Sequence, residues 1–306
     1  MRFRIFIIAF LLSFTAHAAT IVPVSFFKRP PAPAAGGGGG PYSGPLLLDL
    51  AGISNGVRAA YSVFRPTTNY TGNCWKVRRD DSTEQGIAYV SNYVDTATVL
   101  SFGGTGSCWL VTWYDASFHN TNHLTQATAG NQPLVMSSGV LVTNAGLLAS
   151  ILGDGVNDAL TKTMSYSGPH FISCVMKQVS WTSQDFCWAL NNGANQILVQ
   201  RSASPGLSIY DSGYSTVDNN AAVGAPFILQ AKMHSSGSFF QVNNNTDVTF
   251  IDTNPTINSI NLFAYTSGGA SAANVHIQEF IYWGTAFSSD ERTMIRTNTN
   301  ARLPSY

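Results

Sequence analysis

The fold class is decided by one stretch near the end of the chain, Val275-His276-Ile277-Gln278-Glu279-Phe280-Ile281-Tyr282-Trp283. Side chains on an extended backbone point alternately to opposite faces. Strict alternation places Val275, Ile277, Glu279 and Ile281 on one face and His276, Gln278, Phe280 and Tyr282 on the other. One face is then mostly apolar and the other mixed. The pattern predicts a strand in a sheet that buries one side against a second layer.

Similar short runs of β-branched and aromatic residues recur along the chain between clusters of Gly, Asn, Ser and Pro. They cover residues 74–77, 108–114, 171–179, 186–190, 197–200, 227–233, 239–242, 248–251 and 260–265. No long helical period separates them. We therefore expect an all-β fold over residues 46–306, an antiparallel two-sheet jelly-roll sandwich.

Two short helices are expected beside the strands. Ser288 followed by Glu291 is a capping-box pattern, which predicts a C-terminal helix that ends near Asn300. The second helix is expected near residues 52–60.

Composition and charge limit the function. The 306 residues include 16 Lys+Arg and 16 Asp+Glu, and only 10% are charged, against roughly 25% in an average soluble domain. The 27 glycines, 13 prolines and 12% aromatic residues are typical of a turn-rich β protein. A nucleic-acid-binding surface needs an excess of basic side chains, so we expect no nucleic-acid partner.

Residues 1–18 have the features of a secretory signal peptide. Arg2 and Arg4 precede the apolar run 5–12, and Ala16-His17-Ala18 fits the rule of small residues at a cleavage site. The alternative is a membrane anchor, which needs about 20 apolar residues. We therefore expect a mature protein without a membrane span, secreted or attached to the cell surface.

Residues 19–45 are rich in Pro and Gly and include five consecutive glycines. Such a composition predicts a disordered arm rather than a packed element. The arm is either a simple tail or a tether to a surface or an assembly.

Export also bears on the four cysteines, because an oxidising compartment favours disulfides. The runs 171–179 and 186–190 look like the two strands of a hairpin. This arrangement favours a disulfide of Cys174 with Cys187 and leaves Cys74 with Cys108. Four buried thiols are the alternative. No pair of cysteines has the C-x-x-C spacing that zinc sites favour.

Several phrases of the sequence resemble one enzyme family. They are Ala60-Tyr61-Ser62, Val77-Arg78-Arg79-Asp80-Asp81-Ser82, Leu110-Val111-Thr112-Trp113-Tyr114-Asp115 and His123-Leu124-Thr125-Gln126-Ala127. These phrases resemble the catalytic domain of α-L-arabinofuranosidase B, glycoside hydrolase family 54. The segments 153–158 and 277–284 are similar to parts of concanavalin A-like and laminin-G-like domains. The resemblance implies a concanavalin A-like jelly roll whose partner is a polysaccharide or a cell-surface glycan.

The chain departs from the family pattern at both catalytic positions. The family nucleophile is a Glu before an apolar-Tyr pair, and the counterpart Leu207-Ser208-Ile209-Tyr210 has no carboxylate there. The family acid is an Asp in a Gly-Gly-Asp loop, where this chain has Gly268-Gly269-Ala270. Retaining glycosidases need two carboxylates, so these departures favour a non-catalytic domain. Asp211 and Asp185 are the candidate catalytic residues if the chain is an active glycosidase.

Two further sites with aspartate side chains have a predicted role. Asp154, Asn157 and Asp158 concentrate oxygen atoms in one segment and form a candidate Ca²⁺ site, although a tight Asp-Gly turn explains the same residues. No other cofactor is expected. Asp115 is expected to accept backbone hydrogen bonds that hold the turn at residues 116–122.

Aromatic rings are the main candidates for sugar contacts, because sugars stack their apolar faces on rings and bond polar groups at their edges. Alternation places Trp109 and Trp113 on one face of their strand. Further candidates for sugar contacts are Trp188, Tyr210, Asn191 and Asn192. The sequence thus predicts a secreted, lectin-like carbohydrate-binding domain. The alternatives are an active α-L-arabinofuranosidase and a structural or adhesion protein of a cell-surface or virion assembly.

Overall fold

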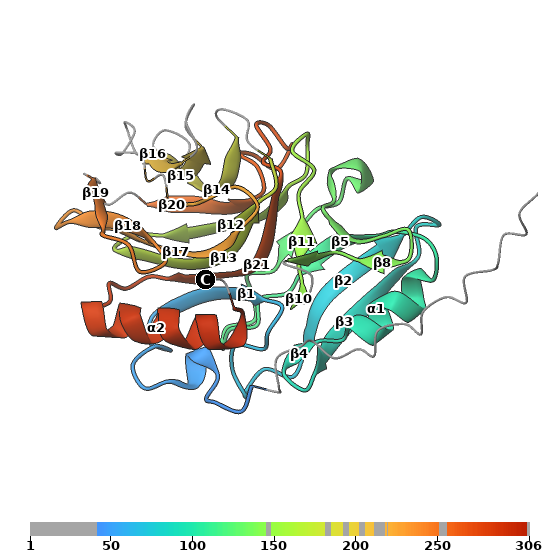
Figure 1. Cartoon of the computed structure of the whole chain (residues 1–306), viewed down its shortest axis with the longest axis horizontal. Coiled ribbons are helices and arrows are strands. Elements are labelled where there is room, and N and C mark those ends of the chain that lie inside the picture. The colour runs from blue at the N-terminus through green and yellow to red at the C-terminus, as the bar shows by residue number, and fades with distance from the viewer. Residues whose placement is uncertain are drawn as a thin grey trace, which may run out of the picture. The chain divides into compact units, whose positions relative to one another are not determined.

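The computed structural model describes residues 42–144, 148–180, 185–191, 196–201, 206–210, 218, 220–250 and 256–304. The expected signal peptide and most of the expected arm lie outside these residues. The described residues form mainly antiparallel strands in two facing layers, and helix α2 (Ser289–Arg302) covers the outer side of one layer (Figure 1). The predicted all-β sandwich with a C-terminal helix is confirmed.

The first layer is centred on β21 (Val275–Trp283). Its strands follow the order β19 (Val248–Phe250), β18 (Ser238–Val242), β17 (Pro226–Met233), β13 (His170–Gln178), β21 and β1 (Val57–Ser62). The long β13 lies between β17 and β21 along its whole length, so its backbone groups are paired on both sides.

The second layer is longer and faces the first across the core. Its order is β16 (Leu207–Tyr210), β15 (Gln196–Arg201), β14 (Phe186–Asn191), β20 (Ile257–Leu262), β12 (Leu160–Tyr166), β6 (Leu124–Thr125), β5 (Cys108–Trp113), β2 (Asn73–Arg79), β3 (Glu84–Val90) and β4 (Tyr93–Val94). Helix α1 (Thr96–Gly103) begins at Asp95, whose carboxylate accepts the Thr98 N–H.

Short strands connect the two layers at one side. β11 (Ile151–Leu152) pairs with β21 of the first layer and with β7 (Leu134–Ser137), and β7 pairs with β5 of the second. The remaining short elements are β8 (Val140–Leu141), β9 (Thr143–Asn144), β10 (Leu148–Ala149), and the 3-10 turns η1 (Leu47–Asp49) and η2 (Ala129–Asn131).

The core between the layers is built from aromatic rings of both. Trp188 on β14 packs against Phe280 on β21 with ring centroids 5.8 Å apart. Tyr61 on β1 lies 6.0 Å from Trp113 on β5. These side chains are fully buried, and each such ring contributes roughly 2–3 kcal/mol of transfer free energy to folding.

The strict alternation expected for residues 275–283 is wrong because β21 contains a bulge. Val175 of β13 lies opposite Glu279 while the next residue, Met176, lies opposite Ile277, so Gln278 is the extra residue. After the bulge the two faces exchange, and Phe280 enters the main core while Ile281 faces outward to α2. All nine residues of β21 are buried, because its two faces pack against two different hydrophobic clusters.

Helix α2 forms as predicted. The Ser288 hydroxyl accepts the Glu291 N–H, and the Glu291 carboxylate accepts the Ser288 N–H at 2.8 Å, which completes the capping box. Its buried face, at Ile295, packs on the outer side of β21 at Ile281 and Trp283.

One of the two helix predictions is wrong. The helix expected at residues 52–60 is a series of turns followed by β1, whose Ala60 pairs with Ile281. Sheet pairing therefore overrides the helical preference of the alanines. Neither α-helix in the described part of the chain is long and apolar enough to cross a bilayer.

The hairpin on which the predicted pairing of Cys174 with Cys187 rested is wrong, although the two residues lie in the same core cluster, where burial and then the charge of Cys187 raise the pKa of Cys174. β13 and β14 belong to different layers and do not form a hairpin, and Cys108 lies opposite Arg79, which is five residues along β2 from Cys74. Such a separation exceeds what a disulfide spans. The structure contains no disulfide, and all four cysteine side chains are buried in the core.

Candidate functional site

A pocket of about 440 Å³ collects several of the residues that the sequence singled out. It lies where β2, β5 and β7 meet the turn η2 and the segment between β11 and β12. Its lining residues are Arg78, Trp109, Ala129, Gly130, Gln132, Leu134, Asp154 and Asp158. We call it the Trp109 pocket.

One wall of the Trp109 pocket is an arginine stacked on an indole. Arg78 and Trp109 are direct partners in the register of β2 and β5, and the Arg78 guanidinium carbon lies 4.8 Å from the Trp109 ring centroid. Arg78 Nε donates to Gln132 Oε1 at 2.7 Å, and Gln132 Nε2 donates to the Gln126 carbonyl at 2.9 Å. These bonds hold the cation over the ring, a favourable contact of roughly 1 kcal/mol.

A bulge decides which tryptophan reaches this wall. Lys76 pairs with Thr112 and Val77 with Leu110, so Val111 is an extra residue of β5. Trp109 and Trp113 therefore point to opposite faces, and their predicted common face is wrong. Trp113 is fully buried in the core, whereas Trp109 is partly exposed at the pocket.

The opposite wall is a turn that holds two carboxyl groups. Asp154 Oδ1 accepts the N–H groups of Val156 and Asn157 at 2.7 and 3.2 Å. Asp158 Oδ2 accepts the Asp154 N–H at 2.9 Å. Asp154 is exposed, but Asp158 is only 4% exposed.

The electrostatics of Asp158 are unusual for a carboxyl group. Burial, helped by the negative charge of Asp154, raises the pKa of Asp158 to about 7, against a smaller opposing effect of the Asp154 N–H. Burial raises the pKa of an acid because the charged form loses its hydration. Asp158 is therefore about half protonated near neutral pH and offers an O–H donor inside the pocket.

The predicted Ca²⁺ site falls on the same turn. The backbone N–H groups already occupy one oxygen of each aspartate, as in an Asx turn. Among the residues that the structure describes, no three His, Cys, Asp or Glu side chains gather closely enough to hold a metal ion. Calcium binding through Asp154, Asn157 and Asp158 stays a prediction.

The glycine loop before β21 packs against this turn. Gly269 has φ +78°, and a Cβ there would lie 1.9 Å from the Asn157 carbonyl oxygen. Gln126 Nε2 donates to the carbonyls of both Ala159 and Ser267, and so joins the two segments. Only glycine fits at position 269, and the loop supports the turn that carries Asp158.

The other predicted contact residues lie apart from the Trp109 pocket. Trp188 is fully buried in the core, so its ring is closed to a ligand. Tyr210 ends β16, the far edge of the second layer. Asn191 ends β14, and Asp185 immediately precedes that strand. Asn192 and Asp211 lie outside the described residues.

The predicted role of Asp115 is confirmed. Its buried carboxylate accepts the N–H groups of Ala60 at 2.9 Å, Ser117 at 3.0 Å and Asn122 at 3.2 Å. It therefore joins the turn at residues 116–122 to β1 and has a structural role.

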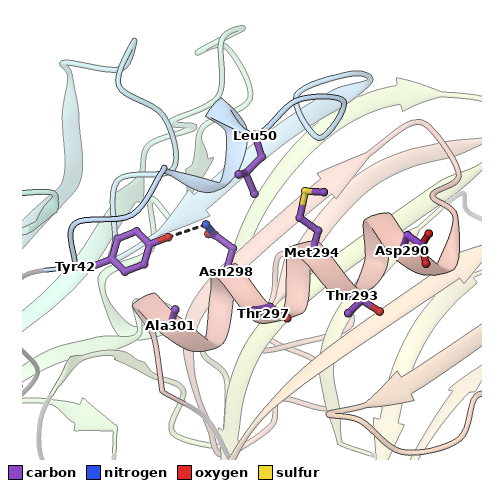
Figure 2. Close-up of a pocket in the computed structure, with 8 residues that line it drawn as sticks. All are labelled: Tyr42, Leu50, Asp290, Thr293, Met294, Thr297, Asn298 and Ala301. Atoms are coloured by element: carbon purple, nitrogen blue, oxygen red, sulfur yellow. Dashed lines mark hydrogen bonds between the residues drawn. The ribbon is translucent and has the colours of Figure 1, made fainter.

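A larger pocket of about 580 Å³ runs along α2. Figure 2 shows its lining side chains, with Tyr42 at one end and the exposed Met294 near the middle. Asn298 Nδ2 donates to the Tyr42 hydroxyl at 2.9 Å, so the ring is fixed by the helix. Asp290 is its only carboxyl group, and this pocket lacks the paired polar groups of the Trp109 pocket.

Comparison with solved structures places the fold. An arabinofuranosidase complexed with arabinofuranosyl-α-1,2-xylobiose superposes with a TM-score of 0.62 at 17% sequence identity, over 79% of this chain. A family 54 α-L-arabinofuranosidase soaked with a cyclic sulfate inhibitor gives 0.61 at 16% identity, also over 79%. The chain shares its fold with family 54 α-L-arabinofuranosidases. The predicted family resemblance is thus supported at the level of the fold.

The structural match covers only part of those enzymes, and comparison by sequence alone finds no match. The chain covers 62% of each of these two enzymes. No protein-family model matches the sequence. No curated protein matches it either.

Arg78 and Gln132 are the pocket residues that sequence reasoning missed as a binding pair. Arg78 lies within a phrase that carries the family resemblance, but the sequence contains no sign that it stacks on Trp109. The sequence offered only the two strand-forming runs at residues 74–77 and 108–114. Their pairing brings Arg78 opposite Trp109, but the bulge at Val111 shifts the register of that pair.

Proposed function

We propose that the protein binds carbohydrate in the Trp109 pocket, as an exported reader of a polysaccharide or a cell-surface glycan. The observation that carries the proposal is the partly exposed indole of Trp109 in a pocket with an arginine, a glutamine and two carboxyl groups. Sugar sites combine such a ring with a few polar groups for the hydroxyls. The family 54-like fold supports the proposal, because those relatives act on glycans.

The test is binding of the chain without residues 1–18 to a polysaccharide array that includes arabinan and arabinoxylan. We expect a selective signal that Trp109→Ala reduces at least tenfold. The matched control is Phe118→Ala, because Phe118 is 45% exposed and does not line the pocket. A silent array, or equal binding by Trp109→Ala and the unmodified protein, refutes the proposal. Recovery of the chain from the culture medium, beginning at residue 19, tests export.

Glycoside hydrolysis is the second candidate function, and the carboxyl pair Asp154 and Asp158 favours it. In such hydrolysis one carboxylic acid protonates the leaving oxygen while a second carboxylate acts at the anomeric carbon. An acid with a pKa of about 7 suits the first role, which falls to Asp158. The test is release of arabinose from arabinoxylan. Arabinose release that persists in Asp158→Asn refutes this role of Asp158. Binding without any arabinose release refutes hydrolysis and supports carbohydrate binding as the only function of the pocket.

A further inference from the structure

Four side-chain donors without acceptors gather where β1, the end of β12 and the segment before β6 meet. They belong to Arg58 on β1, Lys162 and Tyr166 on β12, and His123 just before β6. Each of these side chains is partly buried, and none lines the Trp109 pocket. None of the four donors has a hydrogen-bond acceptor among the described residues. We call these four residues the Arg58 cluster.

The guanidinium of Arg58 is fixed in position but has no counterion. Its carbon lies 4.7 Å from the Tyr166 ring centroid. It also packs against the backbone of Gly284, where a Cβ would lie 2.6 Å from Nε. Nε is buried without a hydrogen-bond partner, whereas Arg78 donates from all three of its guanidinium nitrogens to described acceptors. An unpaired buried donor is costly, so the position of Arg58 points to an acceptor that a ligand supplies.

The other donors are tied to the same place. Asn122 Nδ2 donates to the Arg58 carbonyl at 2.7 Å, which holds the neighbouring His123 close to β1. His123 Nδ1 accepts the Asp115 N–H at 3.1 Å, so the proton of the neutral ring lies on Nε2. Burial lowers the pKa of His123, Asp115 opposes this shift, and the positive charge of Lys162 adds to it. The Lys162 ammonium therefore lies near His123.

The carboxylate of Asp115 does not neutralise this cluster. Its Oδ1 accepts the N–H groups of Ala60 and Ser117, and its Oδ2 accepts the Asn122 N–H. Neither Arg58 nor Lys162 forms an ion pair with a described residue. Two cations and two neutral donors thus share one region without an acidic side chain to bind them.

We propose that the Arg58 cluster binds the carboxylate of an acidic sugar, so that the recognised glycan contains uronate units. The planar guanidinium matches the two oxygens of a carboxylate, and Lys162 adds a second positive charge. The Tyr166 hydroxyl and His123 Nε2 donate to the hydroxyl or ring oxygens of the same unit. The inference rests on the proposed function for the source of the carboxylate, a glycan, but it places that carboxylate outside the Trp109 pocket.

The experiment is calorimetric titration of the protein with an oligogalacturonide and a glucuronate-substituted xylo-oligosaccharide. Each is compared with its neutral counterpart, a galactan or an unsubstituted xylan oligosaccharide. We expect at least one acidic oligosaccharide to bind about tenfold more tightly than its counterpart, and less tightly as salt is added.

Arg58→Met keeps most of the aliphatic stem but removes the guanidinium, and it is expected to abolish this preference for the acidic form. Arg58→Lys keeps the charge without the planar fork and is expected to restore only part of it. Lys162→Met is expected to reduce the preference by about threefold. The matched control is Lys232→Met, which removes a positive charge beside Phe239 and is expected to change nothing. Urea unfolding checks each variant, and Lys162→Met carries the test if Arg58→Met does not fold.

Several outcomes overturn the inference. Equal affinity for acidic and neutral oligosaccharides refutes it and leaves the proposed function intact. A preference that is lost in Trp109→Ala but kept in Arg58→Met assigns the carboxylate to the Trp109 pocket and has the same consequence. Competition by inorganic phosphate as strong as that by galacturonate shows a general anion site and refutes carboxylate recognition. Binding of neither kind of oligosaccharide refutes both the inference and the proposed function.

Discussion

Replacing Arg302 by methionine tests the buried ion pair that anchors α2 to the sheet. Arg302 Nη1 donates to Glu279 Oε2 at 2.9 Å, and Nη2 donates to Oε1 at 3.2 Å. Both side chains are 0% exposed. Arg302 Nε also donates to Asn298 Oδ1 at 2.7 Å. The arginine therefore neutralises a carboxylate that has no access to water.

The size of the effect follows from what Arg302→Met leaves behind. Glu279 keeps hydrogen bonds from the Ser62 hydroxyl at 2.8 Å and the Thr299 hydroxyl at 3.3 Å, but it loses the opposite charge. Removing one partner of a buried pair costs about 3–5 kcal/mol. We expect a loss of this size in the free energy of unfolding at pH 7.

The assay is urea unfolding followed by tryptophan fluorescence. Glu279→Gln combined with Arg302→Met removes both charges and is expected to recover much of the loss. The control is Lys76→Met, which breaks the half-exposed pair with Glu84 and is expected to cost at most about 1 kcal/mol. If Arg302→Met costs no more than Lys76→Met, the reasoning about the buried charge is wrong.

Three other changes test the local structure. Ser288→Ala removes the cap of α2 and should lower the free energy of unfolding by about 1 kcal/mol, measured by urea unfolding against Thr293→Ala in the same helix. Asp115→Ala orphans several buried N–H groups and should cost about 3 kcal/mol or more, with faster amide exchange at residues 116–122 as the check. Burial lowers the pKa of His276 from 6.5 to about 4, so it withholds a proton that the unfolded chain binds. Stability should be full above pH 6.5 and fall by about 3 kcal/mol towards pH 4, and His276→Gln should flatten this part of the pH profile.

Signals confined to a few neighbouring residues predicted structure well. The Ser288 and Glu291 pair marks the start of α2, because a capping box satisfies donors within one turn. Asp115 was correctly expected to hold the following turn, because its carboxylate accepts the N–H of Ser117, which lies only two residues further along the chain. The β-rich runs predicted most of the long strands for the same reason.

Features that depend on pairing between distant segments were predicted poorly. Cys174 and Cys187 are close in sequence but lie on strands of different layers. Helix α1 was missed because its eight residues carry a weak apolar pattern. The site was predicted in parts: Trp109, Asp154 and Asp158 were each named, but not as one pocket with Arg78.

The sequence by itself determined most of the strand-forming runs and the capped helix, and it named Trp109, Asp154 and Asp158 as candidate binding residues. The tertiary structure decided which face each of those residues occupies. A single extra residue, Gln278 in β21 or Val111 in β5, exchanges the faces of everything beyond it. Whether a residue is extra depends on the neighbouring strand, which is distant in sequence. The bulge therefore places Trp113 in the core and leaves Trp109 beside Arg78 at the pocket, because strand register is a property of the pair and not of either strand alone.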